Sequence, residues 1–290
     1  MKKDIKTRIL VCCHKPSITP DCDGYDSIQV GKARTDVELD MHGDDTGDNI
    51  SDKNDRYCEL TGLYWAWKNL KDEDVIGLCH YRRYFDFHGH CRRPYQGVYY
   101  PSNQLDCIDF SIPDRVLAAV RDGSVVLARP FYYHVSLYED YGLCHFSDDI
   151  RTLEALFKES QTDSFNRAFK KVMLRHDRLC PYNMFLMNRE TLDKYCTWLF
   201  GLLEELEHRI DIDQYNSYQR RIFGFFAERL LNVYVEAEQL KIIHKPVIVI
   251  DDLYKDKTFI ESHSAYRLPF YLSRIAGRYI EIKKKVFHTH

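Results

Sequence analysis

Two arginines and a histidine follow a short apolar run near residue 80. Val75–Cys79 has the length and apolar character of a strand buried on both faces, and His80, Arg82 and Arg83 come after it. Open α/β sheets place their chemistry at such strand ends. A guanidinium keeps its proton and presents a rigid fork of donors, so these arginines could hold a diphosphate or a carboxylate. The alternative is structural, with an arginine paired to a nearby acid and His80 in the core.

The first apolar run ends in a similar way. Ile9–Cys13 predicts a buried strand, and Pro16 stops strand pairing, so His14 and Lys15 should project from the carboxyl edge of the sheet. The sequence contains no GxGxxG and no GxxxxGK[ST] motif, which argues against Rossmann dinucleotide binding and P-loop phosphoryl transfer. A diphosphate bound here would depend on side chains, helix N-termini or a metal ion.

A polar loop and a helix are expected between these two strands. Asn54 or Asp55 can cap a helix that runs to about Asn69. Asn49, Lys53 and Asn54 would then lie at the positive end of this helix, where they could line a pocket for an anion or for sugar hydroxyls. A purely structural capping loop is the alternative.

Further strands and helices alternate along the rest of the chain, which predicts an α/β fold. The expected strands are 125–128, 182–187 and 247–250, and the expected helices are 113–121, 147–175, 188–206 and 217–236. In the last helix, Arg221 and Glu228 fall opposite the apolar face, as the 100° step of an α-helix requires. Such a charged face is often only solvated.

Five motifs occur in order along the chain: CHKP, GDNIS with KN and YCELTGLYWAWKN, IGLCHYRRYF, YNMFLMNRETLDKYCTWLF and RIFGFFAERLLNVYV. Together they resemble the DUF4422 family of bacterial glycosyltransferase-like proteins, which are encoded with capsule, exopolysaccharide and O-antigen genes. The resemblance covers roughly residues 6–250. It implies a GT-A-like nucleotide-sugar-binding sheet flanked by helices in residues 1–250, followed by a C-terminal extension, 251–290.

The resemblance also implies a function. We expect a hexosyltransferase that moves a sugar from a nucleotide-sugar donor to a cell-surface polysaccharide acceptor, with a UDP-linked donor and galactofuranose as a candidate sugar. The residues expected to bind the donor nucleotide are His14, Lys15, Asn49, Lys53, Asn54, Arg82 and Arg83. The residues expected to bind sugar or acceptor are His145, Asn183 and Arg221, and those expected to be catalytic are His80 and Glu228, the latter as general base.

Two other functions compete with this one. The first is a noncatalytic nucleotide- or glycan-binding module with a degenerate site. The second is a metal-dependent hydrolase that uses His14, His80 and His145. Many GT-A enzymes bind Mn²⁺ or Mg²⁺ through Asp-x-Asp, but here that pattern occurs only at 21–23, 72–74 and 211–213, and none of these comes directly after an expected strand. The sequence therefore does not determine whether a divalent metal ion is a cofactor.

Charge and composition limit which binding partners and which cellular compartment are expected. A net charge of −3 gives no general attraction for nucleic acid. No run of eighteen apolar residues occurs, and Met1–Asp4 leads into a strand rather than a signal peptide, so a cytoplasmic protein is expected. Its ten cysteines should be reduced. Arg267–Lys285 carries six basic residues and one acid, so it predicts either an amphipathic helix on the inner face of the cell membrane or a solvated tail.

Overall fold

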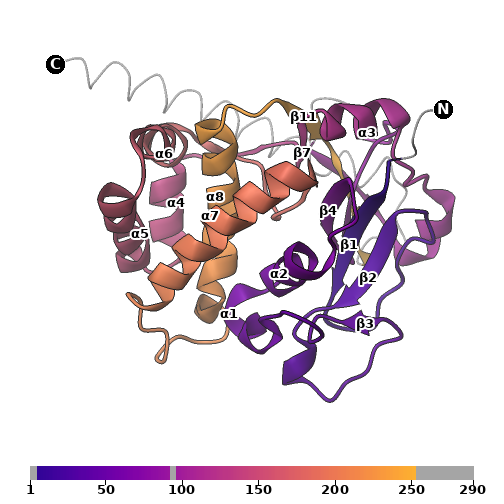
Figure 1. Cartoon of the computed structure of the whole chain (residues 1–290), viewed down its shortest axis with the longest axis horizontal. Helices are drawn as coiled ribbons and strands as arrows, with labels where there is room; N and C mark the ends of the chain where they lie inside the picture. Colours follow the sequence, from indigo (N-terminus) through magenta and orange to yellow (C-terminus); the bar gives the residue numbers. More distant parts are fainter. Residues whose placement is uncertain (1–4, 92–95, 253–290) are drawn as a thin grey trace.

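A mixed, mostly parallel β-sheet flanked by helices forms the protein, which is seen here in a computed structural model (Figure 1). The structure describes residues 5–91 and 96–252. The basic tail at 267–285 lies outside these residues, as does nearly all of the extension expected at 251–290. Within the described part, no helix is long and apolar enough to cross a membrane.

The main sheet has the strand order β11-β7-β10-β4-β1-β2-β3. Its members are β1 (Thr7–Cys13), β2 (Tyr25–Gln29), β3 (His42–Gly43), β4 (Val75–His80), β7 (Val125–Ala128), β10 (Phe185–Asn188) and β11 (Ile242–Lys245). The strands pair in parallel except β10, which is antiparallel to both β4 and β7. The residues that precede β10 therefore reach the same edge of the sheet as the carboxyl ends of β1 and β4.

A second group of strands extends from the end of β4. The chain turns within two residues, because His80 is paired with Arg83, the first residue of β5 (Arg83–Phe85). β5 pairs with β12 (Val247–Ile250), which also pairs with β6 (Gly97–Tyr100). The segment that follows Phe85 contains the strand β6, and its residues 92–95 lie outside the described ranges.

Alternate residues of β1 and β4 belong to two separate apolar cores, as expected for strands buried on both faces. Leu10 and Leu78 pack in the core beneath α2 (Leu60–Asn69) and the C-terminal helices. Ile9 and Cys79 pack in the other core, with the β5, β6 and β12 strands and α3 (Asp114–Arg121). The apolar runs identified in the sequence are thus strands, as predicted.

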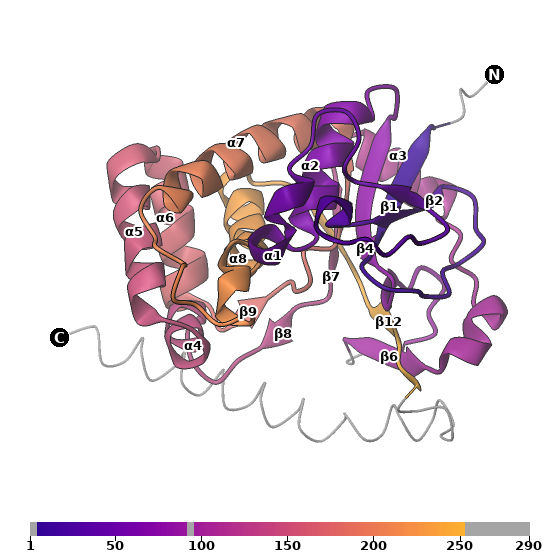
Figure 2. The same cartoon turned by 90° about the horizontal axis from the view of Figure 1, so that it is seen from below.

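The remaining helices gather on one side of the molecule, away from β12 and β6 (Figure 2). They are α4 (Leu137–Cys144), α5 (Ser147–Ser160), α6 (Asp163–Phe169), α7 (Arg189–Glu207) and α8 (Ile222–Ala237). Asn188 caps α7 by accepting a hydrogen bond from the amide of Thr191, as the sequence pattern suggested. A two-stranded sheet, β8 (Phe131–Tyr132) with β9 (Arg178–Leu179), lies between this group and the main sheet.

The single helix expected from residue 54 to 69 is wrong. The structure has two helices, α1 (Asn54–Tyr57) and α2, separated by Cys58 at a positive φ of 54°. Asn54 does not cap the helix from outside; its side-chain amide donates to the Cys58 carbonyl and to the Thr61 hydroxyl across the break. These contacts stabilise the break, because they satisfy groups that a continuous helix would have paired internally.

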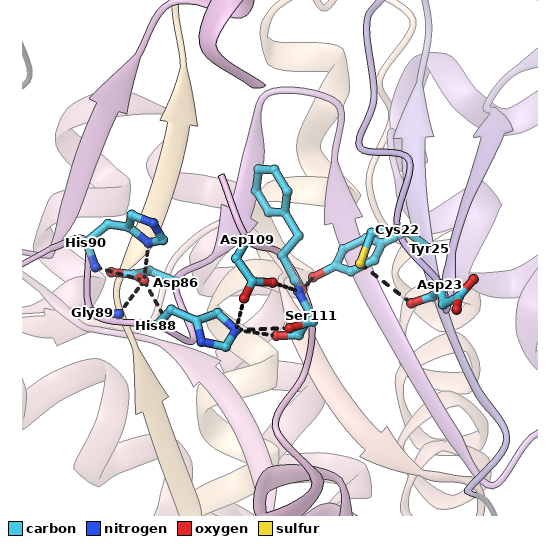
Figure 3. A network of polar contacts seen from close by, with 10 residues as sticks. Cys22, Asp23, Tyr25, Asp86, His88, Gly89, His90, Asp109 and Ser111 are labelled. Carbon is cyan, nitrogen blue, oxygen red and sulfur yellow. Dashed lines mark hydrogen bonds and ion pairs between the residues drawn. The ribbon is translucent and has the colours of Figure 1, made fainter. Parts of the chain in front are cut away.

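A polar network supports the turn after β5, on the side of the molecule with the second group of strands (Figure 3). The buried carboxylate of Asp86 accepts hydrogen bonds from the backbone amides of Gly89 and Cys91 and from the His90 ring. These bonds hold the pKa of Asp86 below its usual range despite burial. His88 contacts Ser111 and Asp109 in the same network. The hydrogen bonds of this network are of the kind that stabilise a turn.

Candidate functional site

A cleft of about 850 Å³ opens at the sheet edge where β1 and β4 end. It contains most of the residues expected from the sequence, namely His14, Asn54, His80, Arg82, Arg83, Asn183, Arg221 and Glu228. They come from the ends of two strands, the turn after β4, the start of α1, the segment before β10, the turn before α8 and the middle of α8. The topology explains this convergence, because β10 runs opposite to its neighbours and brings Asn183 back to the same edge.

Three residues expected to bind the donor do not line this cleft. The Lys15 ammonium lies 5.5 Å from the centre of the Tyr81 ring, in an adjoining groove. Lys53 forms an ion pair with Glu207 at 2.6 Å. Asn49 is bonded to the backbone of its own loop through both its amide nitrogen and its amide oxygen. The positive end of α1 therefore contributes Asn54 to the cleft, but not Asn49 or Lys53.

His145, expected near sugar or acceptor, lies behind the cleft wall rather than in it. Its ring stacks on Phe225 with the centroids 4.2 Å apart, and its Nδ1 is 3.1 Å from the side-chain oxygen of Gln219. Burial lowers the pKa of His145, which favours the neutral ring. The contact with Gln219 supports the short turn Gln219–Arg221 from which Arg221 extends.

The arginines of the cleft differ in their partners. Arg82 pairs with Asp251 at 2.9 Å and donates from Nε to the carbonyl of Ile250. In contrast, Arg83 and Arg221 form no ion pair with any carboxylate of residues 5–91 and 96–252. The Arg83 guanidinium lies over the Tyr182 ring at 4.5 Å. Among the described residues, these two guanidinium groups therefore line the cleft without being held in an ion pair.

The hydrogen-bond partner of the Arg221 side chain is a thiol. Arg221 donates from Nε to the sulfur of Cys58 at 3.3 Å and lies 5.4 Å from the Phe225 ring. Burial raises the pKa of Cys58 to about 12, so this thiol stays protonated and does not neutralise the guanidinium. Because Gly224 has no side chain, α8 can pack closely against Cys58. A Cβ at position 224 would lie only 3.2 Å from the Cys58 sulfur.

Both histidines of the cleft favour the neutral state. Burial lowers the pKa of His80, with Arg83 acting in the same direction and Glu59 opposing it. Partial burial also lowers the pKa of His14, together with the positive charges of Lys15 and Arg221. His80 Nε2 lies 2.6 Å from the carbonyl oxygen of Tyr182 and must donate to it, since a carbonyl only accepts.

Two carboxylates face these cations. Glu228 lines the cleft with its side chain 24% exposed and accepts a hydrogen bond from the Tyr182 amide at 2.5 Å. Burial raises the pKa of Glu228, and the neighbouring negative charge of Glu59 adds to this shift, while Arg229 opposes it. Glu59 also lines the cleft and accepts from the side-chain amide of Asn183 at 2.6 Å.

The sequence did not identify Glu59 as a site residue. An unbroken helix would bury Glu59 one turn inside, where its charge would need a partner. The break at Cys58 instead places it at the start of α2, in the cleft. Nothing in the local periodicity marks the break, because cysteine has no special preference for a positive φ. The pairing of Glu59 with Asn183, 124 residues away, depends on tertiary structure.

Comparison with known proteins fits this architecture. The sequence profile of the family described as "Domain of unknown function (DUF4422)" matches residues 8–239. The chain belongs to the DUF4422 family. The solved apo structure of WbbM, described as a bifunctional glycosyltransferase, resembles this DUF4422 chain with a TM-score of 0.75 and 29% sequence identity. The match covers 85% of this chain and 45% of WbbM, so the chain spans less than half of that relative's length. No curated protein matches the chain.

The residues present in this DUF4422 chain do not form a metal site of the usual kind. Within residues 5–91 and 96–252, no three His, Cys, Asp or Glu side chains come together in an arrangement that could hold a metal ion. His14 and His80 share the cleft, but His145 stacks behind its wall, so the three histidines of the hydrolase hypothesis do not form one centre. The described residues alone therefore do not provide the group of oxygen ligands that Mn²⁺ or Mg²⁺ requires.

Proposed function

We propose that the protein is a glycosyltransferase that moves a hexose from a nucleotide-sugar donor to a glycan acceptor. The observation that carries the proposal is the pair of guanidinium groups, Arg83 and Arg221, that line the cleft and form no ion pair with the described residues. The likeness to a chain described as a bifunctional glycosyltransferase supports it. The sheet would be of the GT-A-like, nucleotide-sugar-binding kind, and the antiparallel strand β10 beside β4 is consistent with this.

The cations would act on the leaving group. When the bond between the sugar's anomeric carbon and the phosphate oxygen breaks, the nucleoside diphosphate keeps the electron pair and gains negative charge. Preorganised guanidinium groups stabilise that charge more in the transition state than in the bound donor, so they accelerate transfer rather than only strengthen binding. Arg83 and Arg221 are placed for this role, with His14 beside them.

A carboxylate of the cleft would take the proton. The acceptor hydroxyl forms the new bond to the anomeric carbon, and its proton must pass to a base. Glu228 fits, because its pKa is raised above the usual range of a carboxylic acid and one of its oxygens is held by the Tyr182 amide. His80 would orient donor or acceptor beside it. Asn183 donates its amide hydrogens to Glu59 and to the Gly224 carbonyl, so its contribution to hydroxyl binding would come from its oxygen alone.

The donor and acceptor follow from the family resemblance. We propose a UDP-linked donor, with galactofuranose as the first sugar to test, and an acceptor belonging to a cell-surface polysaccharide such as a capsule, an exopolysaccharide or an O-antigen. The tail at 267–285 would hold the protein against the inner face of the membrane, near a lipid-linked acceptor.

A panel of nucleotide sugars tests the proposal. Purified protein should release UDP from at least one UDP-sugar, and the rate should rise when short glycans are added as acceptors. A noncatalytic nucleotide-binding module is the second candidate, favoured by the same cationic cleft. It would raise its melting temperature with UDP and yet release no UDP from any donor, with or without acceptor. That result would refute the transferase.

A further inference from the structure

One short bend contacts three of the proposed active-site groups at once. Tyr182 and Asn183, which precede β10, are consecutive non-glycine residues with positive φ angles of 77° and 54°. Left-handed backbone of this kind is costly for residues with a Cβ and persists where surrounding contacts hold it. We call this pair the Tyr182–Asn183 bend.

The backbone amide, the backbone carbonyl and the ring of Tyr182 each have a separate partner in the cleft. Its amide donates to Glu228, and its carbonyl accepts from His80 Nε2. Its ring lies under the Arg83 guanidinium, 4.5 Å from it. The proposed base, the histidine and one of the leaving-group cations are therefore positioned by a single residue through its backbone and ring.

The bend is itself fastened through Asn183. The side-chain amide of Asn183, a residue that is only 3% exposed, donates to Glu59 at 2.6 Å and to the Gly224 carbonyl at 3.2 Å. A hydrogen bond to a carboxylate is about twice as strong as one between neutral groups, so the contact with Glu59 is the stronger of the two. Glu59 in turn is oriented by the left-handed Cys58, at the break between α1 and α2.

We infer that Glu59 is a positioning residue that fastens the Tyr182–Asn183 bend and thereby aligns Glu228, His80 and Arg83 for sugar transfer. This inference rests on the proposed function. Under this inference the break between α1 and α2 has a structural role, because it directs the Glu59 carboxylate into the cleft toward Asn183. It also explains why a carboxylate stands in a cleft otherwise suited to an anionic ligand: its contact is with the bend.

Glu59 has an electrostatic effect as well. The charged or polar groups that face Glu228 are Arg229 on α8, the Tyr182 amide before β10, Glu59 at the break, Arg83 on β5 and Tyr133 after β8. Of these, Glu59 is the carboxylate, and its charge raises the pKa of Glu228. Removing that charge while keeping the hydrogen bond should lower the pKa of Glu228 and move the acid limb of the rate profile to lower pH.

Two substitutions separate the effects. Glu59→Gln keeps an oxygen that accepts from Asn183, so we expect a kcat within about threefold of wild type and an acid limb displaced to lower pH. Glu59→Ala removes the acceptor, so we expect kcat to fall by about tenfold or more, with a smaller change in the donor KM. Glu205→Ala, at an exposed position of α7, is the matched control and should leave both constants unchanged.

A second measurement does not depend on catalytic activity. In ¹⁵N-histidine NMR spectra, the His80 Nε2 proton bonded to Tyr182 should be visible in wild type and in Glu59→Gln, and it should be lost or displaced in Glu59→Ala. An unchanged His80 signal in Glu59→Ala, or unchanged kcat and pH profile in both variants, would overturn the inference. If wild type releases no UDP from any donor, the proposed function fails instead, and the His80 signal still decides whether Glu59 fastens the bend.

Discussion

At the scale of single residues, the partner of a charge decides its role. Arg82 and Arg83 are identical and adjacent, so the sequence cannot rank them. In the fold, the first is bound to Asp251 and the Ile250 carbonyl, whereas the second lies over Tyr182 without an ion pair to the described residues. A guanidinium already bound to a carboxylate has less charge to offer a diphosphate. If the proposed function holds, Arg83 is therefore expected to contribute more than Arg82 to stabilising the leaving group.

The two arginines provide a matched pair of substitutions. We expect Arg83→Lys to lower kcat/KM by about 10²–10³-fold, the range seen when one preorganised donor to a developing anion is lost. Arg82→Lys should lower it by less than about tenfold, because the Asp251 contact tolerates an ammonium better than a bidentate phosphate contact does. Rates measured with the best donor of the panel check this. A larger loss in Arg82→Lys would assign the leaving-group contact to Arg82.

At the scale of secondary-structure elements, left-handed residues mark where the chain departs from its local pattern. Cys58, Tyr182 and Asn183 all have positive φ, and all three line the cleft. The unfavourable backbone is kept there by hydrogen bonds from Asn54 and to Glu59. The remaining non-glycine residue of this kind in the described chain is Gln239, which follows α8 far from the cleft and has no such contacts.

Gln239 offers a test of this distinction. The amide of Leu240 donates to the carbonyl of Val235, so Gln239 occupies the left-handed position that ends a helix and that favours glycine. Gln239→Gly should stabilise the fold by about 1 kcal/mol and raise the melting temperature by about 2–4 °C without changing activity. Gln239→Ala keeps the Cβ and should give no such gain. Calorimetry distinguishes these outcomes, and equal melting temperatures for both variants would contradict the argument.

At the scale of the whole molecule, the cleft is assembled from segments that are distant in sequence. His14 follows β1, His80 ends β4, and Glu228 comes from the middle of α8. The described residues that surround the cleft provide guanidinium groups rather than a cluster of metal ligands. Neutralisation of the diphosphate is therefore expected to come from the protein itself.

This expectation predicts how the protein responds to chelation. Excess EDTA should leave the rate of UDP release within about twofold of the untreated protein, because the cations that act on the leaving group are covalent parts of the chain. Added Mg²⁺ or Mn²⁺ should have a similarly small effect. An activity that disappears in EDTA and returns with Mn²⁺ would show that the diphosphate brings a metal ion to the cleft.

The sequence by itself predicted β1, β4, β7, β12 and most of β10, the approximate positions of α3, α7 and α8, and most of the cleft residues. It did not predict β5, β6 or β11, and it joined α5 with α6 in one helix. Apolar runs such as Val75–Cys79 can be stable only when buried on both faces, and the polar residues that end them must then lie at a sheet edge. Family motifs pointed to Asn183, Arg221 and Glu228, and the structure places all three in the cleft.

Only the tertiary structure decided how those residues are connected. The choice of Asp251 as the partner of Arg82 and the contact between Glu59 and Asn183 each depend on groups brought together over long sequence distances. Short-range periodicity reports which face of an element is buried, but it carries no information about which distant side chain meets it there. For that reason Glu59 could be identified as a residue of the cleft only from the tertiary structure.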